Sequence, residues 1–229
     1  QILLDMDCGE GYDRSTLDLL GDQEKLMQAL IETGKPLVVV YIQGRTLKMN
    51  LAAEKANALL TAWYPGGEGG HAIADVLFGD YNPAGRLPVS IARNEGQLPI
   101  YYSKGDQRAY MDGNANALYS FGYGLSYTKF EYSDLQIKPG NGKDVLQTVT
   151  CTVKNAGDRD GQEIVQLYIR DMVASIAQAP ILLKAFERVE LKKGESKTVT
   201  FNLGKQELSI YNAALEEVVE PGDFKVMVG

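Results

Sequence analysis

The hydrophobic pattern of this chain changes its period near residue 126, and this change constrains the fold more than any other feature. Before it, segments with the spacing of a helix alternate with short, continuous apolar runs typical of buried strands. After it, runs rich in Val, Thr, Tyr and Phe alternate apolar and polar residues with a period of two. The sequence therefore predicts an α/β domain followed by an all-β domain. Two domains suit 229 residues, since one usually takes roughly 100–200.

Residues 1–92 carry the α/β signals. The predicted elements are the end of a strand at 1–5, a helix stopped by Gly34, a strand at 36–42, a weak helix at 48–56, a strand at 58–63, a helix at 71–78 stopped by Gly79, and a strand at 87–91. Strands at 36–42 and 58–63 are expected to be buried on both faces, because their runs are continuously apolar. Such strand–helix repeats predict a partial α/β sandwich, a parallel sheet with flanking helices.

Residues 93–124 differ from both neighbours. They are rich in Gly, Asn and Tyr and show little periodicity, so they predict an extended connector that is functional or packs along a domain interface. The all-β domain then covers residues 125–229. Its strand-like runs lie at 127–137, 145–155, 162–170, 182–191, 196–203 and 223–228. About seven short strands in ~100 residues are typical of an immunoglobulin-like or fibronectin type III-like sandwich.

Composition and net charge limit the kinds of ligand that this chain is expected to bind. The 23 Lys and Arg against 30 Asp and Glu give a net charge of −7, which disfavours nucleic acid because a phosphate backbone is repelled. A neutral small molecule or a sugar fits better with a chain that holds 13 Tyr. No apolar run approaches ~18 residues, so no membrane span is expected. The first residues lack the basic n-region and the cleavage site of a signal peptide, so none is expected there.

The sequence contains no pattern that predicts a metal site or a cofactor site. One His and two distant cysteines cannot supply the three or four ligands of a zinc site, so no metal is expected. Cys8 and Cys151 fall in different predicted domains and are expected to be free thiols. The glycines at 66–70 do not complete a phosphate-binding G-x-G-x-x-G, because Ala72 occupies the third position. No cofactor is predicted, and His71 is expected to be a solvated or helix-packed residue rather than part of a catalytic triad.

Carboxylates remain as candidates for chemistry, and Glu10 is the first. It lies between two glycines just after a strand expected to be parallel, and ligands collect beyond the carboxyl ends of such strands. A carboxyl held near Tyr12 and partly desolvated would have a raised pKa and could act as a general acid. The alternative is a surface loop with a solvated acid. Asp13 and Arg14 are either an ordinary surface pair or anchors that orient Glu10.

Glu68 shares the Gly-Glu-Gly setting. It is expected at a helix N-terminus, where a negative charge is stabilised by ~0.3–1 kcal/mol and the pKa of a carboxyl is lowered. A lowered pKa suits helix capping and works against proton donation at neutral pH. Glu68 is therefore expected to be structural.

Five stretches of the chain, in order, match one known family. They are 9–14 (Gly-Glu-Gly-Tyr-Asp-Arg), 62–79 (beginning Ala-Trp-Tyr-Pro-Gly), 82–88 (Asn-Pro-Ala-Gly-Arg-Leu-Pro), 121–128 (Phe-Gly-Tyr-Gly-Leu-Ser-Tyr-Thr) and the tail from 153 to 222. On these stretches the chain resembles glycoside hydrolase family 3, the β-glucosidase and β-xylosidase family. Each motif alone is weak, but five in register cover the chain nearly end to end.

The resemblance implies a domain plan and one catalytic residue. Members of the family have an N-terminal (β/α)8 barrel, an α/β sandwich domain and often a fibronectin type III-like domain. This chain resembles the later part of the sandwich domain and the complete fibronectin type III-like domain, without the barrel that carries the nucleophile Asp. By the family's pattern Glu10 is the general acid/base. Asp13 and Arg14 would anchor its loop, and Tyr12 would line the aglycone side.

The implied function is that of the C-terminal portion of a retaining β-glycosidase acting on terminal β-linked glucose or xylose. Such an enzyme is expected in the periplasm or outside the cell, and this portion alone is expected to be inactive. One alternative is a non-catalytic module that binds glycan or protein. Another is a flavodoxin-like binder fused to an immunoglobulin-like domain, which would need a phosphate loop. Exposed strand edges would also favour association into oligomers.

Overall fold

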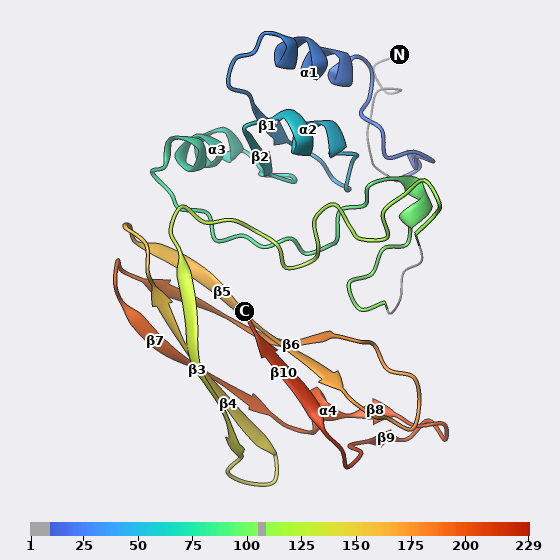
Figure 1. Ribbon diagram of the computed structural model, residues 1–229, viewed down its shortest axis with the longest axis vertical. Helices are drawn as coiled ribbons and strands as arrows, with labels where there is room; N and C mark the ends of the chain where they lie inside the picture. Colours follow the sequence, from blue (N-terminus) through green and yellow to red (C-terminus); the bar gives the residue numbers. More distant parts are fainter. Residues whose placement is uncertain (1–9, 105–108) are drawn as a thin grey trace. The chain divides into compact units, whose positions relative to one another are not determined.

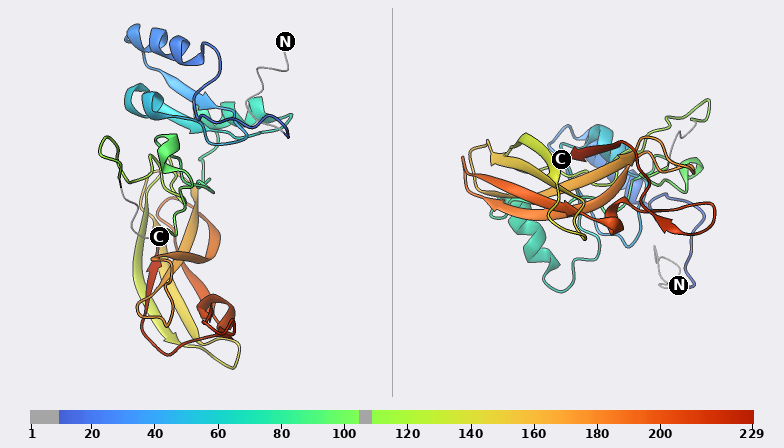
Figure 2. Two further views of the ribbon diagram at one scale, coloured as in Figure 1. Left: turned by 90° about the vertical axis from the view of Figure 1, so that its right-hand side faces the viewer. Right: turned by 90° about the horizontal axis from the view of Figure 1, so that it is seen from below.

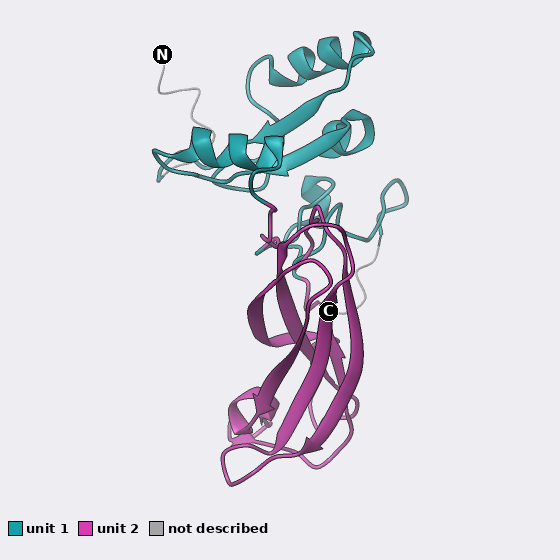
Figure 3. Ribbon diagram, turned by 90° about the vertical axis from the view of Figure 1, so that its left-hand side faces the viewer, with its two compact units in different colours: residues 1–81, 88–101, 107–121 teal, residues 82–87, 102–106, 122–229 magenta. Residues whose placement is uncertain are grey.

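The computed structural model describes residues 10–104 and 109–229 (Figure 1). The chain forms two compact units, which Figure 3 colours separately. Unit 1 comprises residues 1–81, 88–101 and 107–121, and unit 2 comprises residues 82–87, 102–106 and 122–229. The two units therefore do not correspond to a single cut in the sequence, because residues 82–87 of the predicted α/β domain belong to unit 2 and the predicted connector is divided between both units.

Unit 1 contains the α/β elements. They are α1 (Gln23–Glu32), β1 (Val38–Tyr41), α2 (Asn50–Lys55), β2 (Ala58–Thr61), α3 (Gly69–Phe78) and the 3₁₀ turn η2 (Glu95–Gln97). Strands β1 and β2 pair in parallel, with Val38 opposite Ala58, as the strand–helix alternation predicts. Gly34 and Gly79 follow α1 and α3 with φ of 68° and 86°, the left-handed conformation in which glycine commonly ends a helix.

Two expectations for unit 1 are wrong. Neither β1 nor β2 is buried on both faces: Val38 is 48% exposed and Ile42, just after β1, 62%, and Ala58 of β2 is exposed. The reason is that, within residues 10–104 and 109–229, β1 has β2 as its one strand neighbour. Residues 87–91, all described, form no strand, and Ile91 makes an isolated bridge with Tyr119. Pro88 has no N–H to donate to a ladder. The predicted strand end at 1–5 lies outside the described residues.

Unit 2 contains a β-sandwich, which confirms the predicted fold class. Its elements are β3 (Phe130–Pro139), β4 (Gln147–Asn155), β5 (Gly161–Asp171), β6 (Leu182–Leu191), β7 (Ser196–Leu203), α4 (Lys205–Leu208), β8 (Ile210–Tyr211), β9 (Glu217–Val218) and β10 (Phe224–Val228). Two antiparallel sheets, β3-β4-β7 and β10-β5-β6, lie face to face (Figure 2). Each of the six predicted runs overlaps one strand of these sheets. The short β8–β9 hairpin has no counterpart among the predictions.

The core of unit 2 explains the period of two in the sequence. Alternate residues of the strands point between the sheets, and the most buried of these are Val149, Val153, Val165, Leu167, Val189 and Leu191, each 0% exposed. Because successive side chains of a strand point to opposite faces, intervening residues such as Thr150 and Thr152 of β4 are less buried and polar. The sandwich therefore fills its own interior.

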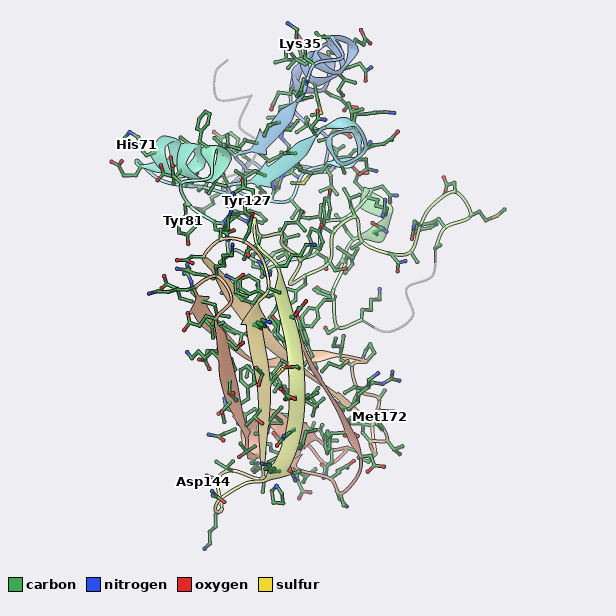
Figure 4. The ribbon with its side chains drawn as sticks, turned by 60° about the vertical axis from the view of Figure 1, so that its left-hand side comes forward. Lys35, His71, Tyr81, Tyr127, Asp144 and Met172 are labelled. Carbon is green, nitrogen blue, oxygen red and sulfur yellow. The ribbon has the colours of Figure 1, made fainter. Side chains whose placement is uncertain are left out.

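Residues 82–87, which we call the strap, belong to unit 2 through polar contacts. The Asn82 side-chain oxygen accepts hydrogen bonds from Ser126 Oγ (2.9 Å) and from the backbone N–H of Tyr127 (2.8 Å), where the chain approaches β3 (Figure 4). Arg86 forms an ion pair with Glu163 of β5, with 2.6 Å between Nη2 and Oε2. This pair is largely buried. The strap is thereby fixed to the sandwich.

Candidate active site

The loop that begins at Glu10 is exposed throughout its first residues. Glu10 and Gly11 lie in a turn, and the φ of Gly11 is 76°, a conformation that glycine adopts without steric cost. Tyr12 is 38% exposed, and Asp13 and Arg14 are exposed as well. The partial burial expected for the Glu10 carboxyl is therefore not provided by the residues that the structure describes. Within the same residues, no ion pair involves this carboxylate.

The first buried side chain after Glu10 is that of Leu17. The backbone at Leu17 is hydrogen-bonded through both its N–H and its carbonyl, to two different segments. The Leu17 N–H donates to Glu95 Oε1 of η2 at 2.7 Å. The Leu17 carbonyl accepts from the backbone N–H of Lys48 at 2.7 Å, and the Thr16 carbonyl accepts from Arg45 Nη1 at 3.0 Å. These contacts fix the far end of the Glu10 loop.

The contacts that anchor this loop come from residues that the sequence did not indicate. The anchoring role of Asp13 and Arg14 stays a prediction, and Arg45, Lys48 and Glu95 make further contacts at Thr16 and Leu17. Glu95 lies 78 residues away in sequence, within a segment without periodicity. No local pattern in a single sequence links such distant positions.

The segment that contains Arg45 and Lys48 follows β1 and is fixed by the buried side chain of Gln43. Gln43 is 1% exposed. Its Nε2 donates to Thr61 Oγ1 at 2.9 Å, and its Oε1 accepts from the Leu47 N–H at 3.2 Å. Its own backbone N–H donates to the Trp63 carbonyl at 3.2 Å. The segments after β1 and β2 are thus joined at the carboxyl edge of the parallel pair, where α/β sheets commonly bind ligands.

Trp63 adds backbone strain at this edge. Its φ is 52°, in the left-handed region that a bulky residue rarely adopts. Such a conformation costs about 1–3 kcal/mol and is found most often at functional sites. The strained residue, the Gln43 bonds and the anchored end of the Glu10 loop all lie at the carboxyl ends of the two strands. This edge is the candidate active site.

Two ionisable groups near the edge have shifted pKa values. Burial, and secondarily the charge of Glu24, raises the pKa of Tyr41 to about 12, so this hydroxyl is neutral at physiological pH. The hydrogen bond from the Leu17 N–H is the largest cause that lowers the pKa of Glu95, and nearby Lys48 adds to it. Glu95 is therefore an ionised acceptor for the loop, and Tyr41 is a structural donor to the Lys48 carbonyl at 3.4 Å.

Glu68 and His71 lie at the start of α3, where Figure 4 labels His71. Glu68 was expected to cap the helix, but its carboxylate makes no cap hydrogen bond with the described first turn. It contacts His71 instead, with 2.8 Å between Oε2 and Nδ1, because residues three apart on a helix face each other. Both side chains are exposed, which confirms the solvated position predicted for His71.

Cys151 of β4 is a buried free thiol whose pKa burial raises, and Cys8 lies outside the described residues. Among residues 10–104 and 109–229, no group of three or more His, Cys, Asp or Glu could hold a metal ion. The same residues contain no helix long and apolar enough to cross a bilayer.

Two protein-family models match this chain, and they show which family it belongs to. Residues 2–127 match the model of the glycosyl hydrolase family 3 C-terminal domain, and residues 163–229 match that of the fibronectin type III-like domain. The chain belongs to glycosyl hydrolase family 3. The match to the first of these models includes the Glu10 loop, the carboxyl edge of β1 and β2, and Glu95.

Family 3 relatives are similar along nearly the whole chain. A β-xylosidase of Formosa agariphila is 44% identical over 97% of this chain and 32% of its own length. A periplasmic β-glucosidase of Salmonella typhimurium is 41% identical over 96% of this chain and 31% of its own length. A solved β-glucosidase from Listeria innocua in complex with isofagomine superposes with a TM-score of 0.90 at 38% identity, over 96% of this chain and 33% of that one. The chain thus spans about a third of these relatives.

Proposed function

We propose that this chain is the C-terminal part of a retaining β-glycosidase of family 3, and that Glu10 is its general acid/base. The observation that carries the proposal is the Gly-Glu-Gly-Tyr-Asp-Arg loop, whose far end is anchored at the carboxyl edge of β1 and β2. The relatives named β-glucosidase and β-xylosidase support a terminal β-linked glucose or xylose as the substrate. One relative is named periplasmic, which supports a location in the periplasm or outside the cell.

In a retaining mechanism Glu10 would act twice. It would first protonate the glycosidic oxygen as the leaving group departs, while a second carboxylate attacks the anomeric carbon. It would then deprotonate the water that hydrolyses the glycosyl-enzyme. The second carboxylate must lie ~5–5.5 Å away, and we assign it to an Asp of an N-terminal (β/α)8 barrel.

The surroundings of Glu10 fit a shared site. Its carboxyl is exposed within this part of the chain, so the barrel and the bound substrate would have to enclose it in the complete enzyme. Tyr12, 38% exposed, would line the aglycone side. Asp13 and Arg14 would support the loop between Glu10 and its anchor at Leu17.

The test is Glu10→Gln in the full-length enzyme. Loss of a general acid typically costs about 10²–10⁴-fold in rate, and the cost falls when the leaving group needs no protonation. We expect a large drop in kcat/KM for alkyl β-glycosides and a much smaller one for dinitrophenyl β-glycosides. Glu68→Gln is a matched control, since Glu68 is also exposed and glycine-flanked. Equal losses for both substrate types would reject the acid role of Glu10.

The 229-residue chain by itself should not hydrolyse these substrates, because one carboxylate cannot carry out a double displacement. Incubation of the purified chain with nitrophenyl β-glucoside and nitrophenyl β-xyloside measures this. Turnover without a barrel polypeptide would show that the nucleophile has been assigned to the wrong part of the protein.

A further inference from the structure

We propose that Glu95 is a positioning residue for Glu10, which it serves by holding the acid/base loop at Leu17. The inference rests on the proposed function of Glu10. Glu95 belongs to η2, in the segment predicted as a connector, and the hydrogen bond it makes to the loop spans 78 residues of sequence. This gives a specific part in the reaction to the connector, which the sequence predicts to be functional or to pack along a domain interface.

The contact between Glu95 and Leu17 has the geometry of a strong hydrogen bond. The distance from the Leu17 nitrogen to Glu95 Oε1 is 2.7 Å, in the range of charge-assisted bonds between an N–H and a carboxylate. The Leu17 side chain is 6% exposed, so this residue is seated in the core of unit 1. The backbone N–H of a residue held in this way loses its partner when the carboxylate is removed.

Glu95 holds a side of the loop that the other described anchors do not. Arg45 and Lys48 bond to the carbonyls of Thr16 and Leu17 and both come from the segment after β1. Glu95 bonds to the N–H of Leu17 from a different element. Without it, the remaining described anchors would all come from one side. Residues 11–16 join this anchor to Glu10, so a change in backbone direction at Leu17 would alter the position of the Glu10 carboxyl.

A change in position at Glu10 would affect catalysis selectively. A displacement of ~1 Å in a reacting group can lower a rate about 10²-fold, because the proton must be delivered along a short, aligned hydrogen bond. Substrates whose leaving groups need a proton would suffer, whereas activated aryl glycosides would be hydrolysed nearly as before. A loss of folding alone would reduce both activities to the same extent.

Gln97 provides a matched control within the same turn. Its Oε1 accepts from the Arg93 N–H at 2.6 Å, and its Nε2 donates to the carbonyls of Asn114 and Asn116 at 2.7 and 3.1 Å. It therefore stabilises the connector without bonding to the Glu10 loop. Gln97→Ala reports what loosening of the connector does by itself.

The experiment compares Glu95→Ala, Glu95→Gln and Gln97→Ala in the full-length enzyme. For Glu95→Ala we expect kcat for alkyl β-glycosides to fall about tenfold, with KM and the rate for dinitrophenyl glycosides changed less than twofold. Glu95→Gln retains an oxygen acceptor and should recover part of the loss. Gln97→Ala should lower thermal stability without altering the ratio of the two activities. Hydrogen exchange should show a Leu17 amide at least tenfold less protected in Glu95→Ala than in Gln97→Ala.

Two outcomes would overturn the positioning role. An unchanged activity ratio in Glu95→Ala would do so, whether or not Leu17 loses protection. An altered ratio in Gln97→Ala equal to that in Glu95→Ala would assign the effect to the connector as a whole. If Glu10→Gln itself shows no dependence on the leaving group, both proposals fall. If it does and Glu95→Ala does not, the present one alone falls.

Discussion

The two units differ in the hydrophobic core that their own residues form. In unit 2 the facing sheets bury Val165, Leu167 and Leu191 completely. In unit 1 the apolar residues Leu26 of α1 and Val38 of β1 are 61% and 48% exposed. Burial of apolar surface is the main favourable term in folding, so the sandwich holds itself together. Both units expose some apolar side chains, Phe186 of β6 at 67% among them, so the contrast lies in the continuous core cluster that unit 2 forms.

The largest loss of stability is expected when the buried ion pair of unit 2 is broken. Arg86 and Glu163 of unit 2 are 2.6 Å apart, with side chains 13% and 8% exposed. Glu163 also accepts a hydrogen bond from the Tyr132 hydroxyl at 2.9 Å. Arg86→Ala leaves the Glu163 charge buried without its cation, which should cost about 3–5 kcal/mol. Urea unfolding followed by far-UV circular dichroism measures the loss.

The control for this prediction lies in unit 1. Lys25 and Asp22 form an ion pair of similar length, 2.8 Å, but their side chains are 84% and 81% exposed. Lys25→Ala should change stability by less than about 1 kcal/mol, because water screens the pair and the freed charge remains solvated. If Arg86→Ala and Lys25→Ala lower the free energy of unfolding equally, burial of the ion pair does not determine its contribution to stability.

The second largest effect is expected when a leucine is replaced by alanine in each unit. Leu167 of β5 is 0% exposed, and Leu167→Ala should cost about 2–5 kcal/mol through lost burial and the cavity it leaves. Leu26 of α1 is 61% exposed, and Leu26→Ala should stay within about 0.5 kcal/mol. Trp63 is the one tryptophan of the chain and belongs to unit 1, so its fluorescence follows that unit during urea unfolding. A cost above 2 kcal/mol for Leu26→Ala would mean that α1 packs more tightly in solution.

The elements that were predicted correctly depend on local patterns. The strands of unit 2 follow from the period of two, since each inward side chain is separated from the next by one outward residue. Helices α1 and α3 follow from apolar spacing and from Gly34 and Gly79, which stop them. The role of Glu10, which rests on its motif, stays a prediction. Each of these signals lies within a few residues of the feature it predicts.

The elements that were missed depend on contacts between distant residues. The expected strand at 87–91 does not form, because Leu87 exchanges hydrogen bonds with Gly122 and Tyr123 while Ile91 pairs with Tyr119. The anchors of the Glu10 loop were missed for the same reason, since Glu95 reaches Leu17 from a segment with no regular pattern. Which residue bonds to a backbone group 78 positions away is decided by the packed fold.

The smallest effect should be equal in the two units. Gly34 after α1 and Gly194 in the turn between β6 and β7 have φ of 68° and 77°, and a Cβ built on either meets no atom within 4 Å. Replacement by alanine at either position therefore adds backbone strain without a steric clash. The strain of a left-handed alanine, about 1–2 kcal/mol, is partly offset because alanine also restricts the unfolded chain.

We therefore expect a net cost of about 1 kcal/mol for both Gly34→Ala and Gly194→Ala. Urea midpoints measured with Trp63 fluorescence for the first and with circular dichroism for the second provide the values. Because this cost is set by the local backbone, it does not depend on how well a unit is packed. A much smaller cost at Gly34 would mean that the end of α1 relaxes to relieve the strain, as expected of an element that lacks part of its packing surface. A cost of similar size at both positions would show that the units differ in the cover of their side chains and not in the order of their backbones.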